Sequence, residues 1–215
     1  MTTGARQRVW LLVGVAITVL AHVFPEWLYS ATWVHFPRAL KAAGPSNWYD
    51  VCALAYGLLL TLPCPRRSGL HFGQIAGRRC RVALACGLPV LAAAVVYPQL
   101  PVRPFAGSSV GMWLISPLAQ DLVFMGFLYS RYETVFPGHI HPKVPIARAL
   151  VLAALFFSMW HLVNLGRVPA PYLLFQLAYT FAGGVITGLA RQWTGSVLYT
   201  AAAHMAVNWI AWAAG

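Results

Sequence analysis

The chain has 215 residues, of which 60% are hydrophobic and only 9% are charged, so its composition excludes an ordinary soluble domain. Its 15 Lys and Arg residues against four Asp and Glu residues give a formal net charge of +11. This length suffices for one helical membrane bundle and leaves no room for a sizeable soluble domain. We therefore expect a single membrane domain over residues 1–215.

Apolar stretches that approach the length of a bilayer crossing recur along the chain. In chain order we predict helices over 9–28, 48–62, 82–98, 110–130, 146–163, 172–190 and 195–213. Several are short for a full crossing, which leaves tilted or re-entrant segments open. Unpaired strand edges cannot face lipid, so we expect an all-α, polytopic transmembrane helix bundle of about six to eight helices, without a β-sheet.

The basic residues are distributed unevenly between the predicted loops. With a cytoplasmic N-terminus, the inside loops and adjoining helix ends hold eleven Lys and Arg residues, namely Arg6, Arg8, Arg66, Arg67, Arg78, Arg79, Arg81, Arg131, Lys143, Arg148 and Arg191. The outside loops hold Arg38, Lys41, Arg103 and Arg167. Topology and anionic lipid explain this charge, so we expect membrane lipids as partners and no nucleic acid. We expect an integral protein of a bacterial inner membrane with its N-terminus in the cytoplasm.

Strongly polar residues occur at three places inside the predicted helices. They are the pair Gln120-Asp121, the pattern Phe157-x-x-x-His161 and the pattern His204-x-x-x-Asn208. Polar groups are costly at membrane depth, so they tend to face a bundle interior and to carry function. We therefore expect Gln120 or Asp121, together with His161, His204 and Asn208, to share one pocket.

The chemistry open to such a pocket is limited by its residue types. Two imidazoles and an amide can bind a metal, hold a water molecule or stabilise an oxyanion. Asp121 is the only acidic residue inside a predicted span, because Glu26, Asp50 and Glu133 fall in loops or at helix ends. The sequence does not identify a cofactor. A divalent metal held by His161 and His204 is an open alternative with a thin set of ligands.

The sixth predicted helix carries three closely spaced glycines, Gly183, Gly184 and Gly188. Small residues at such spacing let the backbones of two membrane helices approach closely. We expect close helix packing there, either within the protein or against a partner.

The polar motifs resemble those of the CPBP family, which comprises the CAAX prenyl endopeptidases, bacteriocin-processing proteins and lysostaphin resistance protein A-like proteins. The stretch 116–128, Ser-Pro-Leu-Ala-Gln-Asp-Leu-Val-Phe-Met-Gly-Phe-Leu, is similar to its first motif, which runs Glu-Glu-x-x-x-Arg. Phe157-x-x-x-His161 resembles the second motif, and His204-x-x-x-Asn208 resembles the third. The resemblance covers roughly residues 110–212, which we interpret as a CPBP-like core.

The resemblance implies an intramembrane protease site at Gln120, Asp121, His161, His204 and Asn208. In the family the first glutamate is thought to activate the attacking water, while the histidines and the asparagine surround that water or stabilise the oxyanion. Gln120 and Asp121 stand here for the two glutamates, and Met125 stands for the arginine. Loss of a general base typically costs about 10²–10⁴-fold in rate. Neighbouring helical positions differ by roughly 100°, so we expect that Asp121 could replace the base only if the helix rotated.

Three functional hypotheses follow from these departures. The degraded acid pair favours a non-catalytic subunit or scaffold, a pseudoenzyme that binds a partner helix, a lipid or a cofactor in a membrane complex. An integral membrane protein partner is therefore left open. The first alternative is an active glutamic-type intramembrane endopeptidase that uses Asp121. The second is a pigment- or haem-binding subunit with His161 or His204 as an axial ligand.

Overall fold

The protein is an all-α bundle in the computed structural model, which describes residues 3–33, 45–73, 75–100 and 111–213. Its α-helices are α1 (Thr3–Trp33), α3 (Pro45–Thr61), α4 (Arg79–Val96), α5 (Ser116–Asp121), α6 (Tyr129–Val135), α7 (Arg148–Trp160), α8 (Ala170–Thr194) and α9 (Leu198–Ala213). Short 3₁₀ turns, η1 (Tyr97–Gln99) and η4 (His161–Asn164), extend α4 and α7. Two π-helical segments, η2 (Gly111–Ile115) and η3 (Leu122–Leu128), flank α5.

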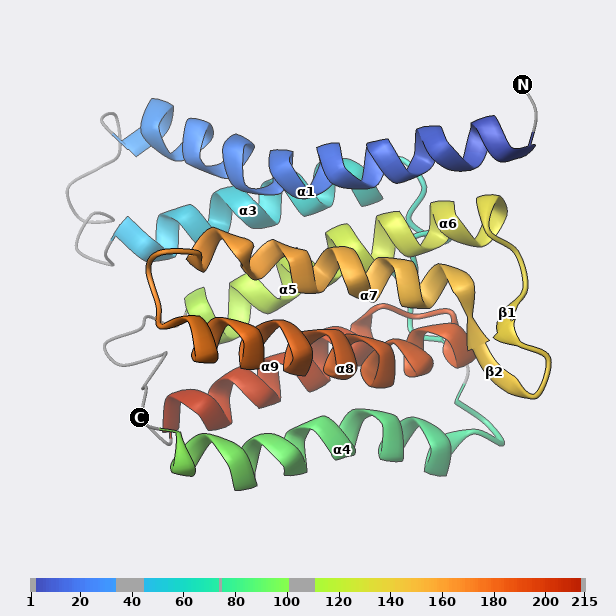
Figure 1. Ribbon diagram of the computed structural model, residues 1–215. Helices are drawn as coiled ribbons and strands as arrows, with labels where there is room; N and C mark the ends of the chain where they lie inside the picture. Colours follow the sequence, from blue (N-terminus) through green and yellow to red (C-terminus); the bar gives the residue numbers. More distant parts are fainter. Residues whose placement is uncertain (1–2, 34–44, 74, 101–110, 214–215) are drawn as a thin grey trace.

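These elements form seven helical rods within the described residues, because η2, α5, η3 and α6 follow one another without a break (Figure 1). Each of the seven predicted ranges falls on one rod, and the prediction of an all-α bundle is confirmed. Four rods are long and apolar enough to cross a membrane: Thr3–Trp33, Arg79–Gln99, Gly111–Val135 and Ala170–Thr194. Trp48–Thr61 and Arg148–Asn164 are shorter apolar helices. The first rod is longer than predicted at both ends, because the mostly polar residues 3–8 and residues 29–33 are helical as well.

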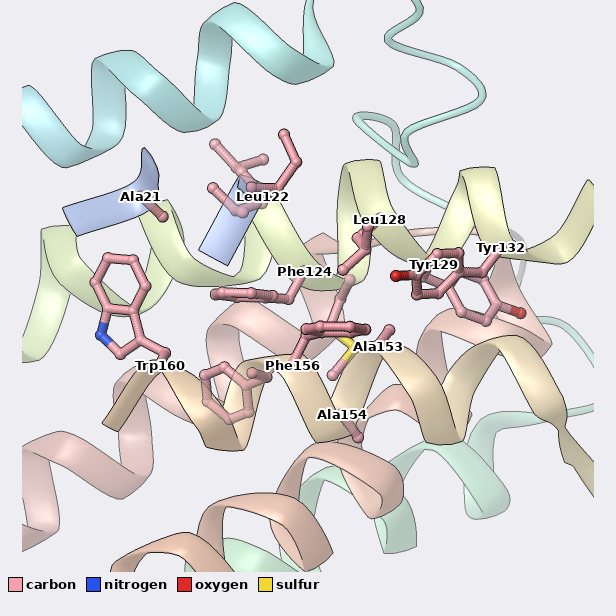
Figure 2. Packing of buried hydrophobic residues seen from close by; sticks show 14 of the residues in the cluster. Ala21, Leu122, Phe124, Leu128, Tyr129, Tyr132, Ala153, Ala154, Phe156 and Trp160 are labelled. Carbon is pink, nitrogen blue, oxygen red and sulfur yellow. The ribbon is translucent and has the colours of Figure 1, made fainter. Parts of the chain in front are cut away.

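The rod Gly111–Val135 is the most buried of the four long rods. In an 18-residue apolar window of this rod, 61% is buried inside the protein, whereas 22% is buried in the corresponding windows of Thr3–Trp33 and Arg79–Gln99. Its side chains Phe124, Leu128 and Tyr129 are fully buried and pack against Ala153 and other residues of α7 (Figure 2). The other helices therefore expose apolar faces to lipid, whereas this rod fixes the interior around which they pack.

One end of the bundle gathers four separate parts of the chain. Figure 1 shows the start of α1, the connection from α3 to α4, the connection from α6 to α7 and the α8–α9 turn at the same end. Hydrogen bonds join these parts: Gln7 Nε2 donates to Val135 O at 3.3 Å, and Val197 N donates to Gly69 O at 3.0 Å. The Arg78 side chain donates to Trp193 O in the same region. The segments to which the sequence assigns most of the basic residues thus lie together.

A small hairpin at this end departs from the expectation of a chain without β-sheet. Strands β1 (His139–His141) and β2 (Val144–Ala147) pair antiparallel in the α6–α7 connection. The residues of β1 are exposed, and the hairpin lies outside every helix that could cross the membrane. The prediction was wrong in this detail because water can satisfy the strand edges there, whereas lipid could not.

The glycines of α8 have two different environments. A Cβ atom at Gly188 would collide with the Leu150 side chain of α7, and one at Gly184 would lie 3.1 Å from the Phe157 ring. A Cβ at Gly183 would meet nothing within 4 Å. The close packing predicted from the sequence therefore occurs within the protein, between α7 and α8, at two of the three glycines.

Candidate active site

The predicted polar residues surround one cavity of about 250 Å³ between α5, α7, α8 and α9. Its lining includes all five sequence-predicted site residues, namely Gln120, Asp121, His161, His204 and Asn208. Its lining also includes a row of aromatic rings in contact with one another, Tyr97, Tyr179, Phe175 and Tyr172. The cavity thus joins a polar half, which can activate or orient a small reactant, to a half that suits an apolar group.

A direct contact between Asp121 and His204 lies at the polar half of this cavity. His204 Nδ1 and Asp121 Oδ2 are 3.0 Å apart, and it is the one contact of salt-bridge type among the described residues. Asp121 is only 4% exposed, so its charge has little water around it. When Nδ1–H donates to the carboxylate, the Nε2 atom of His204 is left as an acceptor. This is the arrangement by which a carboxylate orients a histidine that takes up a proton.

Gln120 and Asp121 both reach the cavity, although they are adjacent in sequence. Met112, Ser116 and Gln120 are four residues apart and form one stripe along the rod, with Gln120 Nε2 donating to Ser116 Oγ at 3.1 Å. Asp121 occupies the next position around the helix, where α9 brings His204 to meet it. Asp121 therefore lines the cavity without a rotation of the helix. The cavity lining is wide enough to include two neighbouring positions, because α9 packs against α5.

His161 lies where α7 ends and the 3₁₀ turn η4 begins. The ring of Phe157 contacts both imidazoles edge-on, with its centre 5.7 Å from that of His161 and 5.3 Å from that of His204. His161 Nδ1 is buried and has no hydrogen-bond partner of good geometry in the described part of the chain. The backbone carbonyls of Phe157 and Ser158, one turn earlier in the same helix, lie close to this imidazole.

Amide side chains complete the polar lining. Asn208 Nδ2 donates to Met112 O at 3.2 Å, and Asn164 Nδ2 donates to Gln176 Oε1 at 3.0 Å. An asparagine amide has two N–H groups, and the bond to Met112 O uses one of them. The second N–H of Asn208 can therefore donate to a carbonyl oxygen held in the cavity.

A buried arginine from another helix, Arg191, contacts the backbone at Met125, the residue that stands in place of the arginine of the family's first motif. The sequence placed Arg191 among the basic residues at a cytoplasmic helix end, but its side chain is only 5% exposed. Arg191 Nε donates to Met125 O at 3.3 Å, and Nη2 donates to Arg67 O at 2.8 Å and to Ser130 Oγ at 3.0 Å. Its guanidinium also lies 5.3 Å from the centre of the Tyr129 ring. The positively charged guanidinium of Arg191, on α8, therefore lies beside Met125.

A second buried carboxylate, at Asp50 on α3, was missed by the sequence reasoning. The predicted helix began at residue 48, which placed Asp50 at a helix end, whereas α3 begins at Pro45. Asp50 is only 2% exposed, and its Oδ2 atom has no hydrogen-bond partner among the described residues. The signal in the sequence was the lone acidic residue at the start of an apolar run.

The donor atoms at the cavity give little support for a metal site. No group of three or more His, Cys, Asp and Glu side chains is arranged to hold a metal ion within residues 3–33, 45–73, 75–100 and 111–213. His161 and His204 are the imidazoles of the cavity, and Asp121 is bonded to one of them.

The apolar helices and the Asp121–His204 pair at the cavity define a polytopic helical membrane protein with a polar site inside its bundle. Residues 103–210, half of the chain, match the family described as Type II CAAX prenyl endopeptidase Rce1-like. The chain belongs to this family, which confirms the resemblance seen in its motifs, and it is an integral membrane protein of the CPBP type. No curated protein and no solved structure matches the chain.

Proposed function

We propose that the protein is an intramembrane endopeptidase in which the Asp121–His204 pair replaces the family's glutamate as the water-activating base. The observation that carries this proposal is the 3.0 Å contact between Asp121 Oδ2 and His204 Nδ1 at the cavity. Gln120 cannot take up a proton, but the pair beside it can. A histidine oriented by a carboxylate is an established general base.

The reaction is the hydrolysis of a peptide bond. A water oxygen bonds to the carbonyl carbon while His204 Nε2 takes one water proton and Asp121 stabilises the imidazolium. The second N–H of Asn208 supports the negative charge that develops on the carbonyl oxygen. The carbon–nitrogen bond then breaks, and the proton on His204 passes to the leaving amine. One water is consumed, and a carboxyl group and an amine are formed.

The aromatic half of the cavity indicates which substrates fit. Tyr97, Phe175 and Tyr179 present ring surfaces next to the polar half, which suits an apolar group joined to the cleaved peptide. The family name refers to prenylated CAAX peptides. Peptides with an apolar or prenylated residue beside the cleaved bond are therefore the first substrates to test.

A second candidate, the non-catalytic scaffold predicted from the sequence, is favoured by a separate observation. Gln120 and Met125 occupy the positions of the family's catalytic acid and arginine, so two parts of the first motif are missing. In that case the same cavity would hold a partner helix, a lipid or a cofactor without cleaving it.

The decisive experiment uses the purified full chain in liposomes with a synthetic peptide mixture, half of it carrying a prenylated cysteine, and identifies products by mass spectrometry. We expect specific cleavage that falls about 10²–10⁴-fold in Asp121→Asn and in His204→Gln. Gln192→Ala serves as control, because Gln192 bonds Ala147 N and Pro145 O at the hairpin, away from the cavity.

The opposite result assigns the scaffold function. If the natural chain cleaves nothing, and cleavage appears only in the triple variant Gln120→Glu, Asp121→Glu, Met125→Arg, the proposal is wrong. Cleavage that persists unchanged in Asp121→Asn and His204→Gln would also overturn it.

A further inference from the structure

Two side-chain amides at the cavity, Asn164 and Gln176, take no part in the hydrolysis described above. Both residues line the cavity, and Asn164 Nδ2 donates to Gln176 Oε1 at 3.0 Å. Gln176 lies between Phe175 and Leu177 in an apolar part of α8, where a polar side chain is costly. Polar groups in such positions tend to face the bundle interior and to carry function. The pair is therefore a candidate for binding a ligand.

Asn164 is placed close to His161 by the local helix geometry. The 3₁₀ turn η4 runs from His161 to Asn164, so these two residues are its first and its last. In a 3₁₀ helix, side chains three residues apart are eclipsed and are displaced by roughly 6 Å along the axis. One residue of an extended peptide spans about 3.3–3.6 Å, so this displacement corresponds to about two residues of a bound peptide.

The hydrogen bond between the two amides leaves one donor and one acceptor available. With Asn164 Nδ2 bound to Gln176 Oε1, Asn164 Oδ1 remains an acceptor and Gln176 Nε2 remains a donor. Both residues are half-buried, and the bond between them is the only hydrogen bond of either side chain within the described ranges. Rotation of both amides would exchange the two ends and would again leave one donor and one acceptor.

A peptide backbone has the complementary groups, because each peptide unit carries one N–H donor and one C=O acceptor. These groups lose their water when a peptide enters an apolar cavity, and burial without new partners is costly. The neighbouring ring of Phe175 has no group that could replace that water. The amide pair offers both of the partners that the backbone needs.

We propose that Asn164 and Gln176 bind the backbone of the substrate peptide within about two residues of the cleaved bond. Asn164 Oδ1 accepts a hydrogen bond from a backbone N–H, and Gln176 Nε2 donates to a backbone C=O. The inference rests on the proposed peptidase function and adds a binding subsite to it. Because all peptides share the same backbone, this subsite recognises an extended chain and leaves the choice of side chain to the aromatic rings of the cavity.

Peptides that carry a single backbone ester test the inference. The ester has no N–H, so it leaves Asn164 Oδ1 without its donor, and its C=O is a weaker acceptor. With the ester placed at each bond in turn, we expect one position to raise KM about 2–10-fold, the usual range for one hydrogen bond, with little change in kcat. In Asn164→Leu and in Gln176→Met the same ester should cost less than about twofold.

A binding measurement gives the same comparison without cleavage. Fluorescein-labelled peptides without a prenyl group are titrated with Asp121→Asn protein in nanodiscs, and the anisotropy is compared with that of empty nanodiscs. The ester should raise Kd by the same factor as KM. Thr180→Val is the matched control: Thr180 also lines the cavity, but its hydroxyl donates to Gln176 O within α8 at 2.7 Å, so this variant should keep the full cost of the ester.

The results separate this inference from the peptidase proposal. A chain that cleaves nothing, but whose ester cost disappears in Asn164→Leu and Gln176→Met, would remove the peptidase function and retain the backbone subsite. A cleaving chain with the same ester cost in both variants would keep the peptidase function and overturn the inference. The inference is also wrong if the peptides do not bind, or if no ester position weakens their binding to the natural chain. If one of the two variants does not fold, the other decides.

Discussion

At the scale of single residues, the five predicted side chains of the site are one carboxylate, two imidazoles and two amides, and they make separate contacts. Asp121 meets His204, Gln120 meets Ser116, and Asn208 meets Met112 O. His161 Nδ1 and Gln120 Oε1 are left as buried atoms without partners in the described chain. Gln120 lines the cavity, so its unpartnered oxygen can accept a hydrogen bond from a molecule held there.

The oxyanion role of Asn208 can be tested directly. Asn208→Ala removes the N–H that would donate to the carbonyl oxygen, so we expect kcat to fall about 10²–10³-fold, as for other lost oxyanion donors. KM should change little, because the interaction strengthens in the transition state. Cleavage rates of the same peptide by Asn208→Ala, Gln192→Ala and the natural chain provide the measurement. Equal rates would remove Asn208 from the mechanism.

At the scale of the elements, two π-helical segments and a buried arginine shape the rod Gly111–Val135. η3 spans Leu122–Leu128, and the carbonyl of Met125 within it accepts a hydrogen bond from Arg191. π-helical turns often occur at functional sites because they alter the direction of side chains and free carbonyl groups. Arg191 joins this segment to the α3–α4 connection through Arg67 O. The arginine of α8 thus ties three elements together close to the site.

We expect Arg191→Met to destabilise the protein by about 1–3 kcal/mol, since Met125 O loses its donor and the other two acceptors lose a charged one. The measurement is the free energy of unfolding in detergent, from denaturant titration followed by circular dichroism. Arg148→Gln, a change at an exposed arginine that bonds His139 O, should shift it by less than about 0.5 kcal/mol. Equal stabilities of the two variants would contradict a structural role for the buried guanidinium.

The glycines of α8 offer a matched pair of substitutions. Gly183→Leu places a side chain in open space at the cavity wall, so the protein should fold while peptide cleavage falls at least about tenfold. Gly184→Leu forces a side chain against Phe157 and Ala154, and we expect a loss of about 1–3 kcal/mol from overpacking. Thermal unfolding and cleavage rates of both variants decide the matter. Full activity in Gly183→Leu would show that substrates do not use this wall.

At the scale of the whole molecule, the segments that carry most of the basic residues lie at one end of the helix bundle. The ends of the elements that carry Arg6, Arg78 and Arg191 lie at one end of the bundle (Figure 1). Arg38, Lys41 and Arg103, which the sequence assigned to the opposite side, lie outside the described residues. An excess of Lys and Arg in loops is typical of the cytoplasmic face. The cytoplasmic N-terminus therefore stays a prediction that the bundle makes easy to test.

Native cysteines at the basic end can report its orientation. Cys64 and Cys80 are exposed and flank the α3–α4 connection, whereas Cys52 is buried. In a bacterial host we expect a membrane-impermeant maleimide to leave intact spheroplasts unlabelled and to label inverted vesicles. The double variant Cys64→Ser, Cys80→Ser should lose this labelling. Labelling of intact spheroplasts at these cysteines would place the basic end, and with it the N-terminus, outside.

Much of this architecture could be predicted from local patterns. Apolar runs gave all seven helical rods, because the cost of exposing backbone to lipid leaves few alternatives to a helix. Their ends were less accurate, since the first turns of α1 and α3 are polar and hydropathy does not register them. Because the predicted start of α3 was three residues too late, Asp50 was placed at a helix end and its burial was not predicted. The hairpin at His139–Ala147 was missed because a bilayer rule does not apply to a segment outside the membrane.

The sequence by itself determined the membrane class, the family and the polar residues that line the cavity, because the cost of polar groups in lipid acts on each helix separately. The tertiary structure alone decided how those residues combine. It paired Asp121 with His204 and set Arg191 against Met125. Such contacts join residues 66 to 83 positions apart, and they depend on the packing of one helix against another, which no local pattern encodes.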